Sequence, residues 1–471
     1  MLNDPDEDFL SGLKGYLGPK GWKLTADDPE KLEEPRGRYH GRAALIARPD
    51  GVDEVAEVIR RCAAARVAVL PHSGGTGLVG GQVMEQGPMP VLLSLERMNR
   101  IRGVSAENNS LIAEAGVILA DVQSAAENVD RLFPLSLASE GSCRIGGNLS
   151  TNAGGVQVLR YGNARDLCLG IEAVMPDGSV VNGLKTLRKD NMGYDLRHLM
   201  IGAEGTLGVI TAAALKLFPR PAERTAAFIA IPTAADSVRL LHFLRPLVGD
   251  VISGFELIDR MGLDFLDQTG MGRPLPFETV PKWSVLMEAG GRPGVRDALE
   301  SALAEAFEAG LATDGAIAQS EAQADAFWEI RESIPEANRR IGAIASHDIA
   351  VPVASIPEFI ARADKEFAAY DPNLRINCFG HVGDGNLHYN LYPPMGGKKQ
   401  DHNHQRADVT RIVHDLAYDM NGTVSAEHGV GRLKVDDLER YGDPGAMAVM
   451  RAIKTALDPL GIMNPGAVLQ G

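Results

Sequence analysis

The feature that most constrains the fold of this chain is a glycine-rich run that directly follows a short apolar run. Val67–Leu70 is typical of a buried strand, and the following Pro71–Gly81 is dominated by glycine and other small residues. Glycine leaves the backbone N–H groups uncovered, so a pyrophosphate can approach them closely. The run therefore predicts a loop that holds a phosphate-bearing ligand.

This run matches the Rossmann fingerprint in its letters. Gly75, Gly77 and Gly80 fit GxGxxG, and Glu96 follows at the end of a later strand. A Rossmann turn has to open a helix, and the segment that would form it is interrupted by Gly80, Gly81, Gly87, Pro88 and Pro90. We therefore expect a phosphate-binding loop outside a Rossmann fold.

Two further glycine-rich stretches follow. Gly141–Gly155 combines small residues with side-chain amides, which is typical of a wall against a large planar ligand with a diphosphate; a long irregular loop is the alternative. Gly202–Thr211 runs from a glycine-rich turn directly into a strand. Three such stretches in one chain favour a large nucleotide-like cofactor.

The chain is long enough for two or three domains. Its 471 residues separate by composition into residues 1–221, 222–421 and 422–471, with Pro219–Pro221 as the first boundary. The first region is rich in glycine and short strands. The second alternates helical patterns such as Ile356–Ala369 with strands such as Trp283–Glu288. We expect an α+β protein.

Charge and cysteine content limit the partners and the compartment. Lys and Arg number 47 against 62 Asp and Glu, a net charge of −15, which disfavours nucleic acid and anionic membranes as partners. An anionic substrate must then be held by a few local Arg, His or metal charges. The four cysteines have no metal or disulfide spacing, the N-terminus lacks a signal pattern, and no apolar run approaches the roughly 20 residues of a membrane span. We expect a cytoplasmic protein without a membrane span.

The three stretches together resemble the FAD-binding domain of the vanillyl-alcohol oxidase (p-cresol methylhydroxylase type) flavoprotein family. Within that family, Leu187–Leu196 and Ser425–Gly429 resemble the D-2-hydroxyglutarate dehydrogenases, and the likeness extends over nearly the whole chain. The resemblance implies an FAD-binding domain of two α+β subdomains. It also implies an α+β substrate (cap) domain with an antiparallel sheet, and a C-terminal segment that returns to the flavin.

The resemblance assigns FAD to the three stretches and to the C-terminal Asn-Pro-Gly motif. Some relatives attach the flavin through a histidine in the first stretch; here it reads Ser73-Gly74-Gly75-Thr76, so non-covalent FAD is expected, with His72 an uncertain tether. The implied FAD-binding residues are Pro71, Ser73, Gly74, Gly75, Thr76, Gly77, Leu78, Gly141, Ser142, Ile145, Gly146, Gly147, Asn148, Thr151, Asn152, Gly154, Gly155, Glu204, Gly205, Gly208, Val209, Ile210 and Asn464.

The segment Phe379–Tyr389 carries two histidines and an acid around Asp384-Gly385. Read as a hairpin with that dipeptide as a two-residue turn, it places His381 directly opposite His388 on one face, with Cβ atoms about 5 Å apart. On spacing alone, a metal site and structural polar histidines are equally favoured. Glu427 is the natural third ligand, and its neighbour His428 then points elsewhere.

The family resemblance favours the metal. It implies His381, His388 and Glu427 as ligands of a divalent ion, with zinc expected, and His428 as the base that takes the substrate hydroxyl proton. Arg331 matches an arginine that binds the substrate carboxylate; an ion pair with a carboxylate distant in sequence is the alternative. Asn386 is implied as a hydrogen-bond donor to the substrate or the metal site.

Together these residues imply an FAD-dependent dehydrogenase that oxidises a D-2-hydroxy acid, with D-2-hydroxyglutarate to 2-oxoglutarate as the first expectation. Two departures weaken that choice: Ser346-His347 stand where the family has a lysine for the distal carboxylate, and Ala467 follows Asn464–Gly466 in place of lysine. D-lactate and D-malate carry the same carboxylate and 2-hydroxyl groups and are the alternative substrates. A zinc hydrolase and a non-catalytic flavin module are the alternatives from other classes. The expected electron acceptor is an electron-transfer flavoprotein or a quinone, and a homodimer is the default assembly.

Overall fold

The structure is a computed structural model that describes residues 1–470. The chain forms two compact units. The first contains residues Met1–Gly155, Gly162–Arg220 and Glu427–Gly471, and the second contains Val156–Tyr161 and Pro221–Ala426. The α+β class expected from the sequence is confirmed, while the division into three functional domains stays a prediction.

A small, mainly parallel sheet in the first unit carries the first glycine-rich stretch. Its strand order is β1-β2-β4-β3, with β2, β4 and β3 parallel. Helix α2 buries Val55, Ile59 and Cys62 against this sheet's core. The bounds are α1 Glu7–Leu17, β1 Trp22–Lys23, β2 Leu45–Ala47, α2 Val52–Ala65, β3 Val69–His72 and β4 Val91–Ser94. Residues 73–90, all described, contain no helix, so the expectation against a Rossmann fold is confirmed.

The second sheet of this unit is antiparallel, in the order β5-β6-β10-β8-β9. Its central strand, β10, is buried along nearly its full length and follows the third glycine-rich stretch. The second stretch, expected as a wall, contains the short helix α4. The bounds are β5 Ile101–Ser105, β6 Ser110–Glu114, α3 Leu119–Glu127, β7 Arg131–Leu132, α4 Ile145–Ser150, β8 Cys168–Val174, β9 Val180–Asn182, α6 Leu196–Met200, β10 Val209–Lys216 and β11 Phe218–Pro219.

The C-terminal segment completes the first unit. After α13 (Val435–Tyr441) and α14 (Pro444–Leu457), Met463 forms a parallel bridge with Val69 of β3. Lys454 of α14 donates hydrogen bonds to the carbonyls of Thr206 and Met463 at 2.8 and 2.9 Å. Residues distant in sequence thus hold the ends of the first and third glycine-rich stretches.

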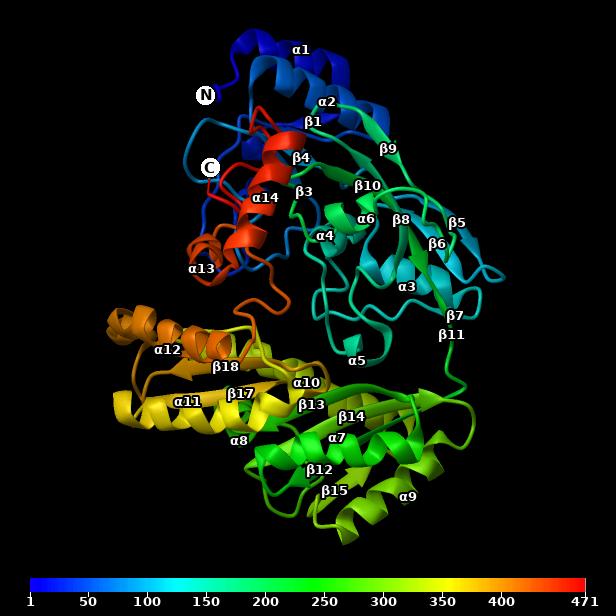
Figure 1. Cartoon of the computed structure of the whole chain (residues 1–471), viewed down its shortest axis with the longest axis vertical. Coiled ribbons are helices and arrows are strands. Elements are labelled where there is room, and N and C mark those ends of the chain that lie inside the picture. The colour runs from blue at the N-terminus through cyan, green and yellow to red at the C-terminus, as the bar shows by residue number, and fades with distance from the viewer. Residues whose placement is uncertain (471) are drawn as a thin grey trace. The chain divides into compact units, whose positions relative to one another are not determined.

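The second unit is built on one seven-stranded antiparallel sheet, in the order β15-β12-β14-β13-β17-β18-β16 (Figure 1). Side chains alternate between two cores, as the period of a strand requires. In β12, Ile229 joins the core with α7, α9, α11 and α12, whereas Phe228 joins the core with α8 and α10. The bounds are α5 Val158–Tyr161, β12 Glu223–Ile231, α7 Ala234–Val248, β13 Ile252–Asp259, α8 Arg260–Gln268, β14 Trp283–Gly291, α9 Val295–Glu308, β15 Asp314–Ile317, α10 Glu321–Ile341, β16 Ile349–Ala350, α11 Ile356–Tyr370, β17 Arg375–His381, β18 Asn386–Tyr392 and α12 Arg406–Asp419.

Within residues 1–470, every helix is too short or too polar to span a bilayer.

Candidate functional site

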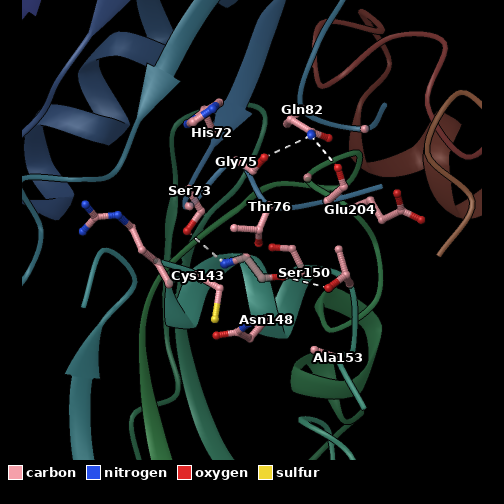
Figure 2. Close-up of a pocket in the computed structure, with 18 of the residues that line it drawn as sticks. His72, Ser73, Gly75, Thr76, Gln82, Cys143, Asn148, Ser150, Ala153 and Glu204 are labelled. Atoms are coloured by element: carbon pink, nitrogen blue, oxygen red, sulfur yellow. Dashed lines mark hydrogen bonds between the residues drawn. The ribbon is translucent and has the colours of Figure 1, made fainter. Parts of the chain in front are cut away.

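The three glycine-rich stretches meet around one cavity of the first unit, of about 540 Å³ (Figure 2). Figure 2 shows Ser73 and Thr76 from the first stretch facing Asn148 and Ser150 from the second, with Glu204 of the third nearby. Two residues of the C-terminal segment, Glu427 and His428, also line the cavity.

Close backbone contact joins the first two stretches. The amide of Gly147 donates to Ser73 Oγ at 3.0 Å. A Cβ at Gly74 would lie 2.8 Å from Cys143 Cα and 2.9 Å from the carbonyl oxygen of Ser142, closer than any side chain tolerates. Only glycine fits at position 74, because the two loops approach there to backbone distance.

Most of the expected cofactor-binding residues line this cavity, and a few do not. Those lining it are Pro71, Ser73, Gly74, Gly75, Thr76, Gly77, Leu78, Gly146, Gly147, Asn148, Thr151, Gly154, Glu204, Gly205, Gly208, Val209 and Ile210. Gly141, Ser142, Ile145, Asn152, Gly155 and Asn464 are not among the lining residues.

Sequence reasoning missed several lining residues, among them Gln82. Its side-chain amide donates to the carbonyl oxygens of Gly75 and Gly77 at 3.3 and 2.7 Å, which holds the first loop in shape. The polar residue at the end of the glycine run was a signal for this role. Pro35, Leu95 and Leu137–Ser139 line the cavity as well and carried no comparable signal, whereas Val79, Arg144 and Ala153 lie within the stretches that were expected to line it.

Asn464 supports the wall of the cavity from behind. Its side-chain amide donates to the carbonyl oxygens of Gly81 and Glu204 at 3.0 and 2.8 Å, and its Oδ1 accepts from Arg432 at 2.9 Å. The Glu204 carboxylate accepts from the amides of Val430 and Gly431 at 2.7 and 2.8 Å. Burial raises the pKa of Glu204, although these two N–H groups oppose the rise.

His72 lies on the cavity wall as a buried, neutral ring. Burial is the main cause that lowers the pKa of His72 to about 4. Among the described residues its Nδ1 atom has no hydrogen-bond partner. The ring is therefore uncharged at neutral pH.

The second group of expected site residues lies on the sheet of the second unit, on the face covered by α8 and α10. Phe379 of β17 and Tyr392 of β18 belong to the core on this face, and side chains two residues apart share a face. His381 and His388 therefore point to the same side, and their ring centroids are 5.7 Å apart.

The expected register of this hairpin is wrong. His388 pairs with Phe379, and His381 pairs with Glu256 of β13. The connection is not a two-residue turn, because a 3-10 turn over Val382–Asp384 and Gly380 at φ +148° take up extra residues. The error is two residues, which preserves the face, so the histidines remain diagonal neighbours.

His381 and His388 each offer a ring nitrogen and Glu427 offers a carboxylate oxygen, so these three residues are the candidate metal ligands. Glu427 is held in turn by the amide of Gly155, which donates to its Oε1 at 2.7 Å. Two imidazole nitrogens and a carboxylate form the kind of donor set that binds a divalent transition metal and leaves a position open.

Glu256 connects His381 to Arg331. Its Oε1 lies 2.6 Å from His381 Nδ1, and its Oε2 lies 2.7 Å from Nη2 and 2.9 Å from Nε of Arg331. Burial would raise the pKa of Glu256, but the electrostatic interactions and hydrogen bonds with these two partners outweigh it and hold the pKa at about 2. Sequence reasoning missed Glu256, which is 75 residues from Arg331.

Arg331 is thus in an ion pair with a carboxylate distant in sequence, the alternative that the sequence left open. Its guanidinium also lies over the Phe379 ring, 4.9 Å from the centroid, and the residue is 5% exposed. Asn386 is similarly engaged: its Nδ2 donates to Asp348 Oδ1 at 3.0 Å and to the carbonyl oxygen of Ile349 at 2.8 Å. Its Oδ1 has no hydrogen-bond partner within the described chain, so the atom it can offer to a ligand is an acceptor.

Comparisons with known proteins place these sites in a family. Residues 43–183 match the FAD binding domain family, and residues 220–468 match the C-terminal domain of FAD linked oxidases. The chain is 36% identical to a probable mitochondrial D-2-hydroxyglutarate dehydrogenase of Oryza sativa subsp. indica, over 100% of this chain and 82% of the relative. It is 35% identical to a D-2-hydroxyglutarate dehydrogenase of Stutzerimonas stutzeri (strain A1501), over 98% and 99%.

The fold also matches solved structures. A crystal structure of p-cresol methylhydroxylase with substrate bound aligns with a TM-score of 0.77 at 17% identity, over 99% of this chain and 98% of the other. This likeness confirms the expected fold, and the sequence matches confirm an FAD-dependent oxidoreductase. The chain belongs to the family of FAD-linked oxidases in which the D-2-hydroxyglutarate dehydrogenases are found.

Proposed function

We propose that this chain oxidises D-2-hydroxyglutarate to 2-oxoglutarate, by metal-assisted removal of the hydroxyl proton and transfer of hydride to the flavin. The relatives' names support this substrate. The observation that carries the mechanism is that Glu427 and His428 are adjacent. Both line the glycine-rich cavity, and in this proposal Glu427 is also the third metal ligand beside His381 and His388.

The cavity fits FAD. At Gly74 the first two stretches approach each other to backbone distance. Their glycines leave backbone N–H groups uncovered, and these groups can bind a diphosphate. Ser73–Leu78 and Gly146–Thr151 would hold the diphosphate, and Glu204–Ile210 would flank the ribityl chain and the flavin. When bound, the flavin accepts hydride at N5. We assign non-covalent FAD, because Ser73–Thr76 contains no histidine to attach it.

The cluster of His381, His388 and Glu427 fits a divalent cation, and we assign zinc. When bound, such an ion acts as a Lewis acid that lowers the pKa of a hydroxyl group. Its three protein ligands would leave a position for the substrate's carboxylate and hydroxyl oxygens. The protein thereby provides locally the positive charge that its net charge of −15 does not.

His428 is the residue that would take the hydroxyl proton, since it adjoins a metal ligand and lines the flavin cavity. Asn386 differs from the role expected of it: both N–H groups of its amide are engaged, so it would accept a hydrogen bond through Oδ1. Arg331, the expected carboxylate clamp, is directed to Glu256.

The residues expected near the distal end of the substrate bear on the choice of a five-carbon diacid. His347, which stands beside the position of the family lysine, is buried, with Nδ1 2.6 Å from the carbonyl oxygen of Tyr389 and Nε2 3.3 Å from Thr410 Oγ1. It therefore does not replace the lysine. D-lactate and D-malate are the next substrates to test, and the FAD-binding match disfavours a zinc hydrolase.

The electron acceptor belongs to the same proposal. An electron-transfer flavoprotein or a quinone would reoxidise the flavin, and a homodimer is the expected assembly. The cytoplasmic location stays a prediction from the sequence; the mitochondrial location is part of the name of the rice relative.

The test is anaerobic addition of D-2-hydroxyglutarate to the purified yellow protein while the flavin absorbance is followed. We expect rapid bleaching that is lost after treatment with EDTA and restored by Zn²⁺, with flavin content unchanged. His428→Ala should retain FAD and lose flavin reduction. Fast flavin reduction in that variant would show that the base is assigned wrongly. Bleaching by D-lactate or D-malate, but not by D-2-hydroxyglutarate, would show that the substrate is assigned wrongly.

A further inference from the structure

Glu256 is a fully buried carboxylate, with an exposed fraction of 0%, on the central strand β13. Each of its oxygens has a different partner: Oε1 meets His381 on the neighbouring strand and Oε2 meets Arg331 on α10. A buried ion pair alone rarely stabilises a protein more than apolar residues of similar volume would. The contact with His381 suggests a role beyond stability.

The contact determines the protonation of the His381 ring. A carboxylate only accepts hydrogen bonds, so at 2.6 Å the proton lies on Nδ1 of His381. The lone pair is then on Nε2, which is the nitrogen that can bind a metal. Glu256 and His381 are also cross-strand partners in the sheet, so the backbone register keeps the two side chains together.

We propose that Glu256 is a positioning residue that orients His381 as a metal ligand, and that Arg331 holds the Glu256 carboxylate in place. The inference rests on the proposed metal site and assigns to this site two residues outside the ligand set. Metal-binding histidines are commonly held in this way through their second ring nitrogen. Arg331 then acts on the metal site through Glu256 and His381.

Arg331 also neutralises the negative charge of Glu256. A second carboxylate near the metal would cancel part of the positive charge that attracts an anionic substrate. The guanidinium binds Glu256 through two nitrogens and is fixed over Phe379, so the pair adds no net charge. Glu256 thus accepts the hydrogen bond of His381, while the net charge of the site remains that of the metal ion and Glu427.

The test compares metal affinity in full-length protein with FAD bound. Glu256→Gln should weaken Zn²⁺ binding, measured by competition with a fluorescent chelator, by about 10- to 100-fold. With Co²⁺ in place of Zn²⁺, its visible absorption band should shift, because the anionic partner of His381 is lost. Flavin content should equal that of the wild type.

Glu288→Gln is the matched control. Glu288 lies on β14 of the same sheet, is 6% exposed and forms an ion pair with Arg224, but the described contacts of its carboxylate include no histidine. This variant should lose stability without a change in Zn²⁺ affinity or in the Co²⁺ spectrum. If Glu256→Gln does not fold because Arg331 is left unpaired, the double variant Glu256→Gln/Arg331→Met removes both charges and should fold with the same loss of affinity.

The outcomes separate this inference from the proposed function. A wild-type protein that binds no Zn²⁺ would end the proposal of a metal site. If wild type binds Zn²⁺ and Glu256→Gln matches it in affinity and in Co²⁺ spectrum, Glu256 is not a positioning residue and the metal site stands. Arg331→Met divides the roles of Arg331: weaker Zn²⁺ binding supports positioning, whereas an unchanged Zn²⁺ affinity with a higher KM for the hydroxy acid would make Arg331 the substrate clamp.

Discussion

The contact between the first two glycine-rich stretches leads to a quantitative prediction for Gly74→Ala. The added Cβ would lie 2.8 Å from Cys143 Cα, 2.9 Å from Ser142 O and 3.0 Å from Arg144 N, where contacts under 3.4 Å are already tight. All three atoms are backbone, so no side chain can rotate away. The loops would have to separate by about half an ångström, a distortion that typically costs about 1–3 kcal/mol.

That cost should appear in FAD affinity. If the loops of Gly74→Ala separate to relieve these contacts, FAD binding must bring them together again around the diphosphate. At about 1.4 kcal/mol per tenfold, the dissociation constant should rise about 5- to 150-fold. Titration of flavin-stripped protein with FAD, followed by quenching of flavin fluorescence, measures it.

Gly141→Ala is the control, because it lies in the second stretch and nothing stands within 4 Å of its added Cβ. Its dissociation constant should match that of the wild type. Equal FAD affinity in Gly74→Ala and Gly141→Ala would refute the argument that backbone proximity of the two loops is needed for cofactor binding.

Two further predictions concern residues at and behind the cavity wall. Burial lowers the pKa of His72 from 6.5 to about 4, so the unfolded chain binds the proton more readily than the folded chain. The contribution of the neutral ring to the free energy of unfolding is therefore fully present above pH 6.5 and is lost as the pH falls toward 4. Urea unfolding should show that wild type loses on the order of 3 kcal/mol more than His72→Gln across that range, and equal losses would contradict the buried neutral ring. Asn464→Ala leaves the carbonyls of Gly81 and Glu204 without their donor, so it should lower the free energy of unfolding by about 2–4 kcal/mol and release FAD on dilution. An unchanged melting temperature would show that Asn464 does not support the wall.

The local chemistry of the site could be predicted from the sequence, and its long-range contacts could not. A glycine run after a strand predicts a ligand-binding loop without reference to any distant residue. The lining of the cavity by Ser73–Leu78 could therefore be predicted from that run alone. The pairing of His381 also depends on Gly380 at φ +148° and on the turn that follows, which the Asp384-Gly385 signal hides. The face of the two histidines could still be predicted, because a two-residue error keeps the alternation.

Contacts between distant segments leave no trace in one sequence. Glu256 reaches His381 across 125 residues, and nothing near either residue identifies the other as its partner. The same holds for Asn464, expected as a cofactor contact from its motif. It lies behind the wall because its backbone N–H donates to the carbonyl oxygen of Val69, in the strand before the first loop. Tertiary packing decides between binding the ligand and supporting the residues that bind it.

The return of the C-terminal segment to the first unit has a consequence for the order in which the protein matures. During synthesis the glycine-rich stretches leave the ribosome early, but Glu427, His428 and the support of Asn464 follow only after the whole second unit has been made. The second unit's sheet lies within one nearly continuous stretch, 221–426, and can form while the chain is still growing. The flavin cavity is thus completed last, and we expect a chain that ends before residue 427 to bind FAD more weakly than the full chain.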